Sequence, residues 1–333
     1  MSKTAEIYRD IFEELKIKKY DPCNNIYRKV ILDNGGSIIY FVTIGERMRG
    51  IAVPISKIKG LPHISWKGLS IEVVSLPQYS EPEQHYIKLQ QTIETDSYIF
   101  EVVIEDIRRN LFQLKVTDYL SALLGCLKRW EDFFKFRKTP ILSNSAVQGL
   151  FGELLFVKDL IINVENDAIT HWVGTNKETH DFYLNSHAVE VKTTIKQAPY
   201  LAHINSEYQL DSSEVKGCLF LRFYALRKSQ TEGEATLPSL IAEIRKMLKN
   251  DVANTNRFNK ILNDFGYFDA AEDYYQESFH IRQEQTFIVK DGFPSIVKKM
   301  LPNGISNLEY DLSISLCEPF EVKSSIMMDI LRG

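Results

Sequence analysis

The sequence predicts a mixed α/β protein in which a β-rich N-terminal domain precedes an α/β domain. Three observations support this fold class. Residues 26 to about 105 contain short apolar segments separated by Gly, Pro, Ser and acidic residues, a pattern typical of successive β-strands. From Asp106 the apolar residues recur at three- and four-residue steps, as on one face of a helix. After Pro140, helical and strand patterns alternate, which is typical of an α/β domain.

The composition is that of an ordinary globular protein. The chain of 333 residues has 44 acidic and 40 basic side chains, a formal net charge of −4, and 44% hydrophobic residues. This length corresponds to about two domains. The composition excludes disordered, collagen-like and disulfide-scaffold chains. The charge argues against a histone-like nucleic-acid binder but allows a local basic surface.

Several motif classes are absent from the sequence. The four cysteines lie far apart and lack the spacing of a zinc finger. Neither a G-x-S-x-G motif nor a P-loop occurs, so acyl transfer and NTP hydrolysis have no motif to support them.

The N-terminal residues predict a helix rather than a signal peptide. Ile7, Ile11, Phe12 and Leu15 fall on one helical face, and acidic residues interrupt the apolar positions. No apolar stretch approaches the roughly 18 residues needed to cross a bilayer. We therefore expect a cytoplasmic protein that does not bind membranes.

The β-rich segment is predicted to begin with a hairpin. Asn34-Gly35-Gly36 lies between two apolar segments, and Asn and Gly tolerate the positive φ angles of tight turns. A helix is then expected, with apolar residues at helical spacing from Leu120 to Phe134. The further strands predicted between the hairpin and this helix are residues 50–55, 69–76, 85–90 and 98–105.

Pro140 marks the predicted boundary between the domains, because proline interrupts a helix. We place the boundary at residues 138–144, which gives domains 1–138 and 139–333. A helix is predicted to begin at Ser145, since Ser145 and Gln148 form a capping-box pattern. The elements predicted after it are strands at 180–184, 188–195 and 217–226, helices at 237–250 and 253–265, a strand at 279–289, a short helix around Ile296 and a strand at 310–316.

Glu153 is a chemically unusual residue within the predicted helix. It is the only charged residue between Ala146 and Val157. Burying a lone carboxylate is costly unless it is paired or binds a metal ion. Gly149 and Gly152 flank Glu153 in the sequence. Each glycine lowers the stability of a helix by about 1 kcal/mol relative to alanine. Such glycines are expected where a helix backbone approaches another element closely.

Two strands after this helix bring further charged residues together. Glu190 and Lys192 lie two residues apart, so they point to the same face of their strand. If residues 185–187 form the turn between the strands, Leu184 pairs with Ala188.

Continuing this register predicts that the carboxylates are neighbours. Phe182 would lie opposite Glu190, and Asp181 opposite Val191. Two carboxylates this close repel each other unless a metal ion or a proton compensates. Oxygen ligands suit Mg²⁺ or Mn²⁺. Lys192 beside such an ion could orient or deprotonate an attacking water.

The acidic-x-Lys pattern alone is common in this chain. It begins at Glu14, Glu190, Glu214 and Glu321. The occurrence at Glu190 is distinguished by the preceding helix with Glu153, and by enough chain after it for a further helix and strand. The alternative interpretation is a surface hairpin with an ordinary Glu/Lys pair and a Glu153 that reaches solvent.

At these residues the sequence resembles the PD-(D/E)XK nuclease superfamily. The superfamily motif has an Asp on one strand and (D/E)-x-K on the next, often with a Glu on the first helix. The matching residues here are Asp181, Glu190 with Lys192, and Glu153.

The runs GLFGELLFVKDL, HDFYL and AVEVKTTIKQAPYLAHINSEYQL resemble one group within this superfamily more closely. It is an uncharacterised bacterial family found beside DNA methyltransferases and ATPases in restriction-like defence clusters. The resemblance is strongest over residues 145–226, and it departs at His180, where the motif usually has Pro. It implies a restriction-endonuclease-like core with a mixed sheet and the order helix–strand–strand–strand–helix–strand.

The resemblance also implies metal-dependent hydrolysis of DNA phosphodiester bonds. Asp181, Glu190 and the carbonyl of Val191 would hold Mg²⁺ or Mn²⁺. Glu153 would act through water or on a second ion, and Lys192 would position the attacking water. The implied setting is a bacterial restriction or anti-phage defence system, with methyltransferase and ATPase subunits as partners.

Candidate DNA contacts lie close to the motif in sequence. Lys196 and Gln197 follow the motif strand and could touch the DNA backbone, or they could form a solvated loop. His180 and His203 could contact phosphate, or they could be ordinary polar or partly buried histidines. Basic runs at residues 128–138 and 245–260 could likewise contact phosphates or be solvated helix faces.

Two other functions stay open from the sequence. The near-neutral charge and the large N-terminal domain are compatible with a catalytically silent DNA-binding or scaffolding subunit that keeps the nuclease fold. A nuclease acting on RNA or on structured nucleic acid is a further alternative. Cutting both DNA strands would favour a homodimer.

Overall fold

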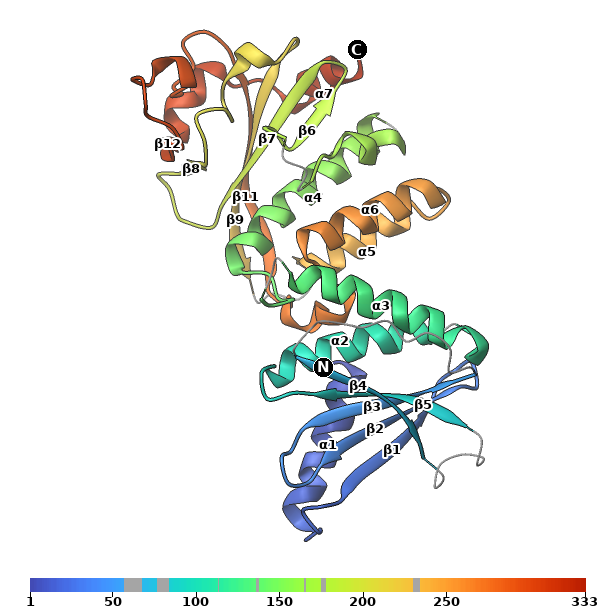
Figure 1. Cartoon of the computed structure of the whole chain (residues 1–333). Helices are drawn as coiled ribbons and strands as arrows, with labels where there is room; N and C mark the ends of the chain where they lie inside the picture. The colour runs from blue at the N-terminus through green and yellow to red at the C-terminus, as the bar shows by residue number, and fades with distance from the viewer. Residues whose placement is uncertain are drawn as a thin grey trace. The chain divides into compact units, whose positions relative to one another are not determined.

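The structure, a computed structural model, divides the chain into two units, each with its own sheet (Figure 1). The first unit comprises Met1–Pro140 and Phe268–Asp273, and the second comprises Ile141–Tyr267 and Tyr274–Gly333. The described residues are 1–56, 68–76, 84–112, 114–135, 138–164, 166–174, 178–229 and 234–333. Within these ranges, no helix is both long and apolar enough to cross a membrane.

The first unit contains a five-stranded sheet with the order β1-β2-β3-β5-β4, in which all neighbours are antiparallel. The predicted hairpin is confirmed, because Ile31 pairs with Ser37 and Gly35 has a φ of 80°. The unit's elements are α1 (Lys3–Ile17), β1 (Asn25–Ile31), β2 (Ser37–Thr43), β3 (Arg49–Ile55), β4 (Leu69–Ser75), β5 (His85–Gln91), α2 (Ser97–Leu111), a 3-10 helix at Val116–Asp118, and α3 (Tyr119–Phe134).

The strand predicted at residues 98–105 is wrong, because this segment belongs to helix α2. Its β-branched residues favour a strand by propensity alone. Phe100, Val103 and Ile107, however, recur at helical spacing and are fully buried. Packing of this apolar face stabilises the helix against the local strand preference.

The second unit is built on a five-stranded mixed sheet with the order β10-β11-β9-β7-β6. Strands β7 and β9 run parallel, and the other neighbours run antiparallel. Its helices and strands are α4 (Asn144–Val164), β6 (Phe182–Leu184), β7 (His187–Thr194), β8 (Leu201–Ile204), β9 (Leu219–Ser229), β10 (Ala235–Thr236), α5 (Leu237–Met247), α6 (Val252–Phe265), β11 (Ser278–Val289), β12 (Tyr310–Ser313) and α7 (Ser324–Arg332). The order α4, β6, β7, β9, α5, β11 is the predicted helix–strand–strand–strand–helix–strand order.

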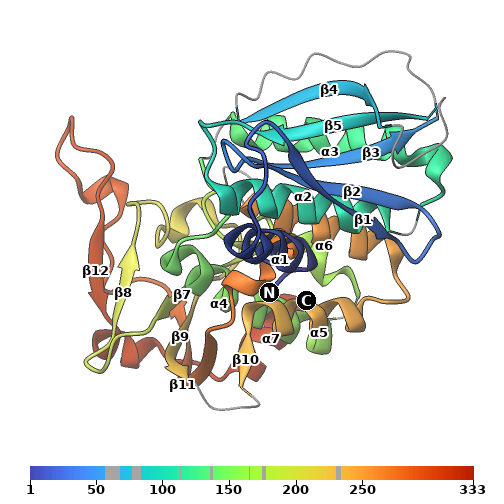
Figure 2. The ribbon, with the colours of Figure 1, turned by 90° about the horizontal axis from the view of Figure 1, so that it is seen from below.

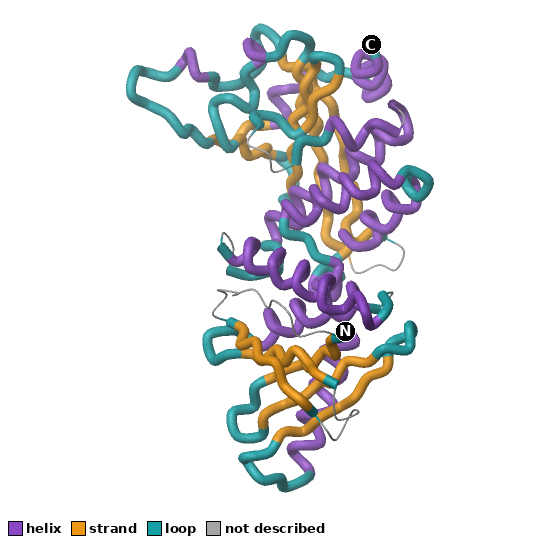
Figure 3. Tube along the Cα trace, turned by 45° about the vertical axis from the view of Figure 1, so that its right-hand side comes forward, coloured by secondary structure: helices purple, strands orange, loops and turns teal. Residues whose placement is uncertain are grey.

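Strands β8 and β12 form a separate antiparallel pair that packs on one side of the mixed sheet. Figures 1 and 2 show this pair on the side of β7, β9 and β11 away from α4. In Figure 3 the helices of this unit gather along the other side of the strands. Ala188 of β7, Leu221 of β9 and Phe287 of β11 share one buried core with Ala202 of β8 and Leu312 of β12. The mixed sheet therefore has a layer on each face.

Local structure differs from the prediction at two places in the second unit. Helix α4 begins one residue earlier than predicted, and the Ser143 side chain, rather than that of Ser145, accepts a hydrogen bond from the Ala146 N–H. Gln148 does not close a capping box, because its side chain donates to the carbonyl of Thr193 on β7. The predicted strand 310–316 ends at Ser313, where a 3-10 helix follows. The short helix expected around Ile296 is a 3-10 turn at Lys298–Met300.

Candidate active site

The β6–β7 hairpin sets the position of the motif residues. The predicted pairing of Leu184 with Ala188 is wrong, because Leu184 pairs with His187 and Phe182 with Val189. Residues 185 and 186 alone form the turn, and both have positive φ angles, 44° and 72°. Two-residue turns of this kind match the twist of a hairpin. Continuing the observed register places the residue before Phe182 opposite the residue after Val189.

Asp181 and Glu190 are therefore direct neighbours across the hairpin. Asp181 Oδ2 accepts a hydrogen bond of 2.8 Å from the Val191 N–H. Glu190 is 1% exposed, and its Oε1 lies 2.9 Å from Lys192 Nζ. Its Oε2 is buried and has no hydrogen-bond partner within the described residues. One carboxylate oxygen is thus left without a partner beside a second carboxylate.

Lys192 is held from two sides. Besides the Glu190 carboxylate, its Nζ contacts Gln209 Oε1 at 2.9 Å. The same amide oxygen accepts a hydrogen bond of 2.8 Å from the Asn205 N–H. Gln209 was not among the residues predicted for the site, although it lies at the end of the run that resembles the superfamily. No local pattern distinguishes it, because its role depends on a contact across 17 residues.

Glu153 enters the site from helix α4. Its Oε2 accepts a hydrogen bond of 2.7 Å from Trp172 Nε1. Trp172 is buried and stacks on Phe265, with ring centroids 5.5 Å apart and an interplanar angle of 22°. This tryptophan is a second residue of the site that was not predicted from the sequence. A buried indole N–H needs an acceptor. The presence of a tryptophan close in sequence to the isolated Glu153 was the sequence signal that could have indicated this hydrogen bond.

Gly152 explains how α4 approaches β7. A Cβ atom added at Gly152 would overlap the Cγ2 methyl of Thr193 and would lie 3.6 Å from Val191 Cγ1. A Cβ added at Gly149 would meet nothing within 4 Å. The close approach expected of both glycines therefore occurs at Gly152 only.

Burial raises the pKa of all three carboxylates, and neighbouring carboxylates raise it further in Glu190 and Glu153. Burial raises the pKa of Glu190 to about 8, the negative charge of Asp181 contributes to this rise, and Lys192 opposes it. Burial, then the charges of Asp181 and Glu190, hold the pKa of Glu153 well above its usual range. Burial also raises the pKa of Asp181, although the Val191 N–H and Lys192 stabilise its charged form. Without a cation, Glu190 retains a proton near neutral pH.

Two of the three other acidic-x-Lys occurrences, those at Glu14 and Glu321, have different surroundings, and the side chain of Glu214 lies outside the described part of the chain. Glu14 pairs with Lys18 and Arg28 on the surface. Glu321 and Lys323 are both exposed. Neither adjoins a buried carboxylate, so the site at Glu190 is distinguished by its burial.

The four residues expected to contact DNA have different environments. Lys196 and Gln197 are exposed in the segment after β7. His203 on β8 contacts Asp311 on β12, 2.9 Å away. His180 is buried, and burial lowers its pKa to about 4, so it is neutral at pH 7. Their contacts with DNA stay a prediction, which for His180 would involve a hydrogen bond rather than a charge.

The described residues contain no group of three or more His, Cys, Asp or Glu side chains arranged to hold a metal ion. The predicted ligands are not all side chains of these four types, since they include the Val191 carbonyl and water. Its donors are oxygen atoms, which suits a hard divalent cation. The unpartnered Glu190 Oε2 is compatible with such an ion.

Comparison with known proteins identifies a family for this chain. The model of the family described as "Putative PD-(D/E)XK family member, (DUF4420)" matches residues 8–315, which is most of the chain. No curated protein matches the sequence. No solved structure matches it either. The chain therefore belongs to this PD-(D/E)XK family, DUF4420.

Proposed function

We propose that the protein is a metal-dependent endonuclease that hydrolyses DNA phosphodiester bonds. The observation that carries the proposal is the buried Glu190 carboxylate, which has one oxygen without a hydrogen-bond partner among the described residues and lies beside Asp181. A buried carboxylate in this state requires a proton or a cation. Membership of a PD-(D/E)XK family supports the cation, because this motif is associated with metal-dependent nucleases.

The ion would be held by Asp181, Glu190 and the Val191 carbonyl, with Glu153 acting through water or on a second ion. A bound Mg²⁺ or Mn²⁺ supplies Lewis acidity to the phosphate and lowers the pKa of a coordinated water. Lys192 lies on strand β7 and would hold the attacking water. Gln209 and Glu190 fix the position of the Lys192 ammonium group.

We further propose that the protein acts in a bacterial restriction or anti-phage defence system with methyltransferase and ATPase partners. The resemblance over residues 145–226 supports this setting. The modest excess of acidic residues supports a partner, because a chain with a net charge of −4 has little long-range attraction for DNA.

Cleavage and metal binding by matched variants test the nuclease. Wild-type protein with Mg²⁺ or Mn²⁺ is expected to nick plasmid DNA, and Glu190→Ala and Lys192→Ala are expected to abolish nicking. Glu321→Ala and Lys323→Ala are the matched controls, because they alter another Glu-x-Lys segment that is exposed, and they should cut as the wild type does.

Calorimetric titration of Mn²⁺ provides a readout that does not depend on cutting. Glu190→Ala should lose Mn²⁺ binding, whereas Lys192→Ala should retain it because Lys192 is not a ligand. Unchanged cutting in both active-site variants would contradict the assignment. Tight DNA binding by a wild type that binds no Mn²⁺ would instead favour the catalytically silent DNA-binding subunit.

A further inference from the structure

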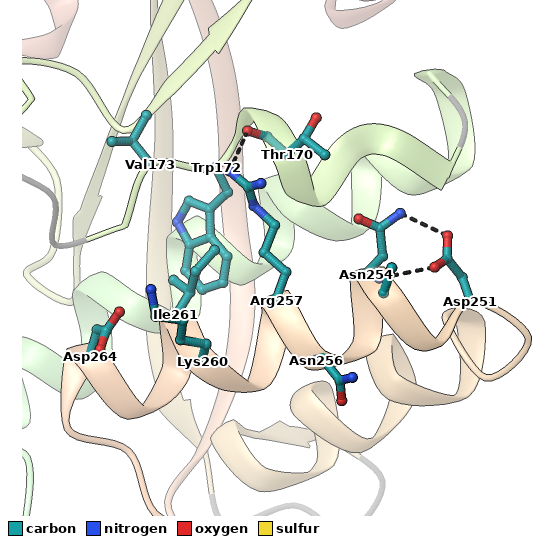
Figure 4. Close-up of a pocket in the computed structure, with 11 residues that line it drawn as sticks. Thr170, Trp172, Val173, Asp251, Asn254, Asn256, Arg257, Lys260, Ile261 and Asp264 are labelled. Carbon is teal, nitrogen blue, oxygen red and sulfur yellow. Dashed lines mark hydrogen bonds between the residues drawn. The ribbon is translucent and has the colours of Figure 1, made fainter. Parts of the chain in front are cut away.

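A cleft of about 690 Å³ opens between helix α6 and the segment that precedes β6 (Figure 4). Its volume is within the range of ligand-binding sites. Trp172, Val173 and Ile261 supply apolar walls, and Arg257 and Lys260 lie at its edge. The cleft lies within the second unit.

Two basic residues of the cleft, Arg257 and Lys260, are available to a ligand. They are three residues apart on α6, so they lie on one face of the helix. Both are exposed, and neither forms an ion pair with any residue in the described part of the chain. The Arg257 guanidinium donates a hydrogen bond of 3.3 Å to the carbonyl of Thr170, a neutral group that leaves its charge uncompensated.

The acidic residues of the cleft, Asp251 and Asp264, lie at the two ends of α6. Asp251 caps α6, and its carboxylate accepts hydrogen bonds from the backbone and side-chain amides of Asn254 at 2.9 and 2.8 Å. Asp264 lies at the C-terminal end of the same helix. Between these two ends of the helix, the charged residues of the cleft are Arg257 and Lys260.

The cleft adjoins the candidate active site through two bonded residues. Trp172 lines the cleft, and its indole N–H donates to Glu153. Val173 is the next residue of the wall, and its N–H donates to the carbonyl of Asp181 at 3.0 Å. A nucleic-acid strand bound at the carboxylates and extending along residues 172–173 would enter the cleft near Arg257.

We propose that this cleft binds the DNA backbone next to the scissile phosphate, with Arg257 and Lys260 contacting phosphate groups. The proposal rests on the nuclease function for the identity of the polyanion. Exposed cations without carboxylate partners attract phosphate most strongly, because no internal ion pair competes. Val173, which is half-buried, leaves apolar surface at the wall of the cleft that can pack against a sugar.

Anisotropy of a fluorescein-labelled DNA duplex tests the proposal with the full chain in EDTA, where no cutting occurs. Arg257→Gln/Lys260→Gln is expected to bind more weakly. The slope of log K against log salt should fall by about one for each phosphate that is no longer neutralised, hence by about two. Lys260→Gln alone should reduce the slope by about one unit. Lys290→Gln/Lys323→Gln is the control, because these exposed lysines are outside the cleft and carry the same charge change.

Arg257→Lys keeps the charge and should keep the salt slope, while thermal melting shows whether removal of the hydrogen bond to Thr170 affects folding.

An unchanged slope in the folded cleft variants would overturn the proposal and leave the nuclease assignment intact. A wild type with no affinity for the duplex would also overturn it. Weakened binding of a labelled deoxynucleoside monophosphate with unchanged DNA binding would assign the cleft to free nucleotides instead. Because binding is measured without metal, a failure of cleavage alone does not decide this test.

Discussion

The carboxylate of Glu190 is buried from solvent. The residue is 1% exposed, and burial with the nearby Asp181 charge raises its pKa from 4.5 to about 8. In the metal-free folded state the side chain therefore binds a proton that the unfolded state releases above pH 4.5. Stability should fall as pH rises from about 4.5 to 8, because the unfolded state binds fewer protons in this window.

Glu190→Gln should stabilise the metal-free protein at pH 8 and flatten the decline in stability between about pH 5 and 8. The amide keeps the shape of the side chain and carries no charge to desolvate. Urea unfolding at several pH values in EDTA measures this effect. Glu321→Gln is the control, because its side chain is exposed and should leave the pH profile unchanged. An equally steep decline in Glu190→Gln would show that Glu190 is not the titrating group.

At the scale of elements, the site depends on the close approach of α4 and β7. Gly152 makes this approach possible, since any side chain there would overlap Thr193. Gln148, one turn earlier on α4, donates to the Thr193 carbonyl and hydroxyl at 2.8 and 3.0 Å. Helix and strand are thus joined by packing and by hydrogen bonds, which fixes Glu153 relative to the motif strand.

Gly152→Ala should destabilise the protein by about 1–3 kcal/mol, the usual cost of adding volume to a packed interior. Gly149→Ala is the matched control on the same helix. It meets no neighbour, so it should be neutral or stabilising by up to about 1 kcal/mol through helix propensity. Chemical denaturation of the two variants gives the comparison. Equal stability of both variants would mean that Thr193 moves aside without cost.

At the scale of the whole molecule, a short segment far along the chain completes the first unit. Phe268 packs on Trp130 and Phe133 of α3, with ring centroids 4.4 and 5.1 Å away. Glu272 pairs with Arg109 of α2 at 2.7 Å. The first unit is therefore discontinuous in sequence, and its aromatic core depends on residues that follow α6.

Phe268→Ala should destabilise the protein by about 3–5 kcal/mol, as expected for truncation of a buried aromatic residue. Ile93→Ala is the control, because Ile93 is 87% exposed and its removal should have little effect. Urea unfolding reports the change in stability, and hydrogen exchange locates it. Faster exchange of the backbone amides of α3 would support the role of Phe268 in this core. Unchanged protection of these amides would contradict it.

Much of the local architecture follows from the sequence because it depends on near neighbours. The hairpin at Gly35, the strands of the mixed sheet and helices α5 and α6 have clear local patterns. The prediction of a strand at residues 98–105 was wrong because the β-branched residues of this segment lie on the buried face of helix α2. The register of the β6–β7 hairpin failed by one residue because turn length depends on backbone conformation at residues 185 and 186.

For the candidate site, the sequence by itself determined that Asp181 lies at the start of the hairpin whose second strand carries Glu190 and Lys192, and that the last two share a face. This follows from the two-residue period of a strand, which is a local property. Only the tertiary structure decided that Trp172 holds Glu153 and that Gln209 holds Lys192. Such contacts, and the burial that shifts the carboxylate pKa values, depend on the packing of segments distant in sequence, for which a single chain carries no local pattern.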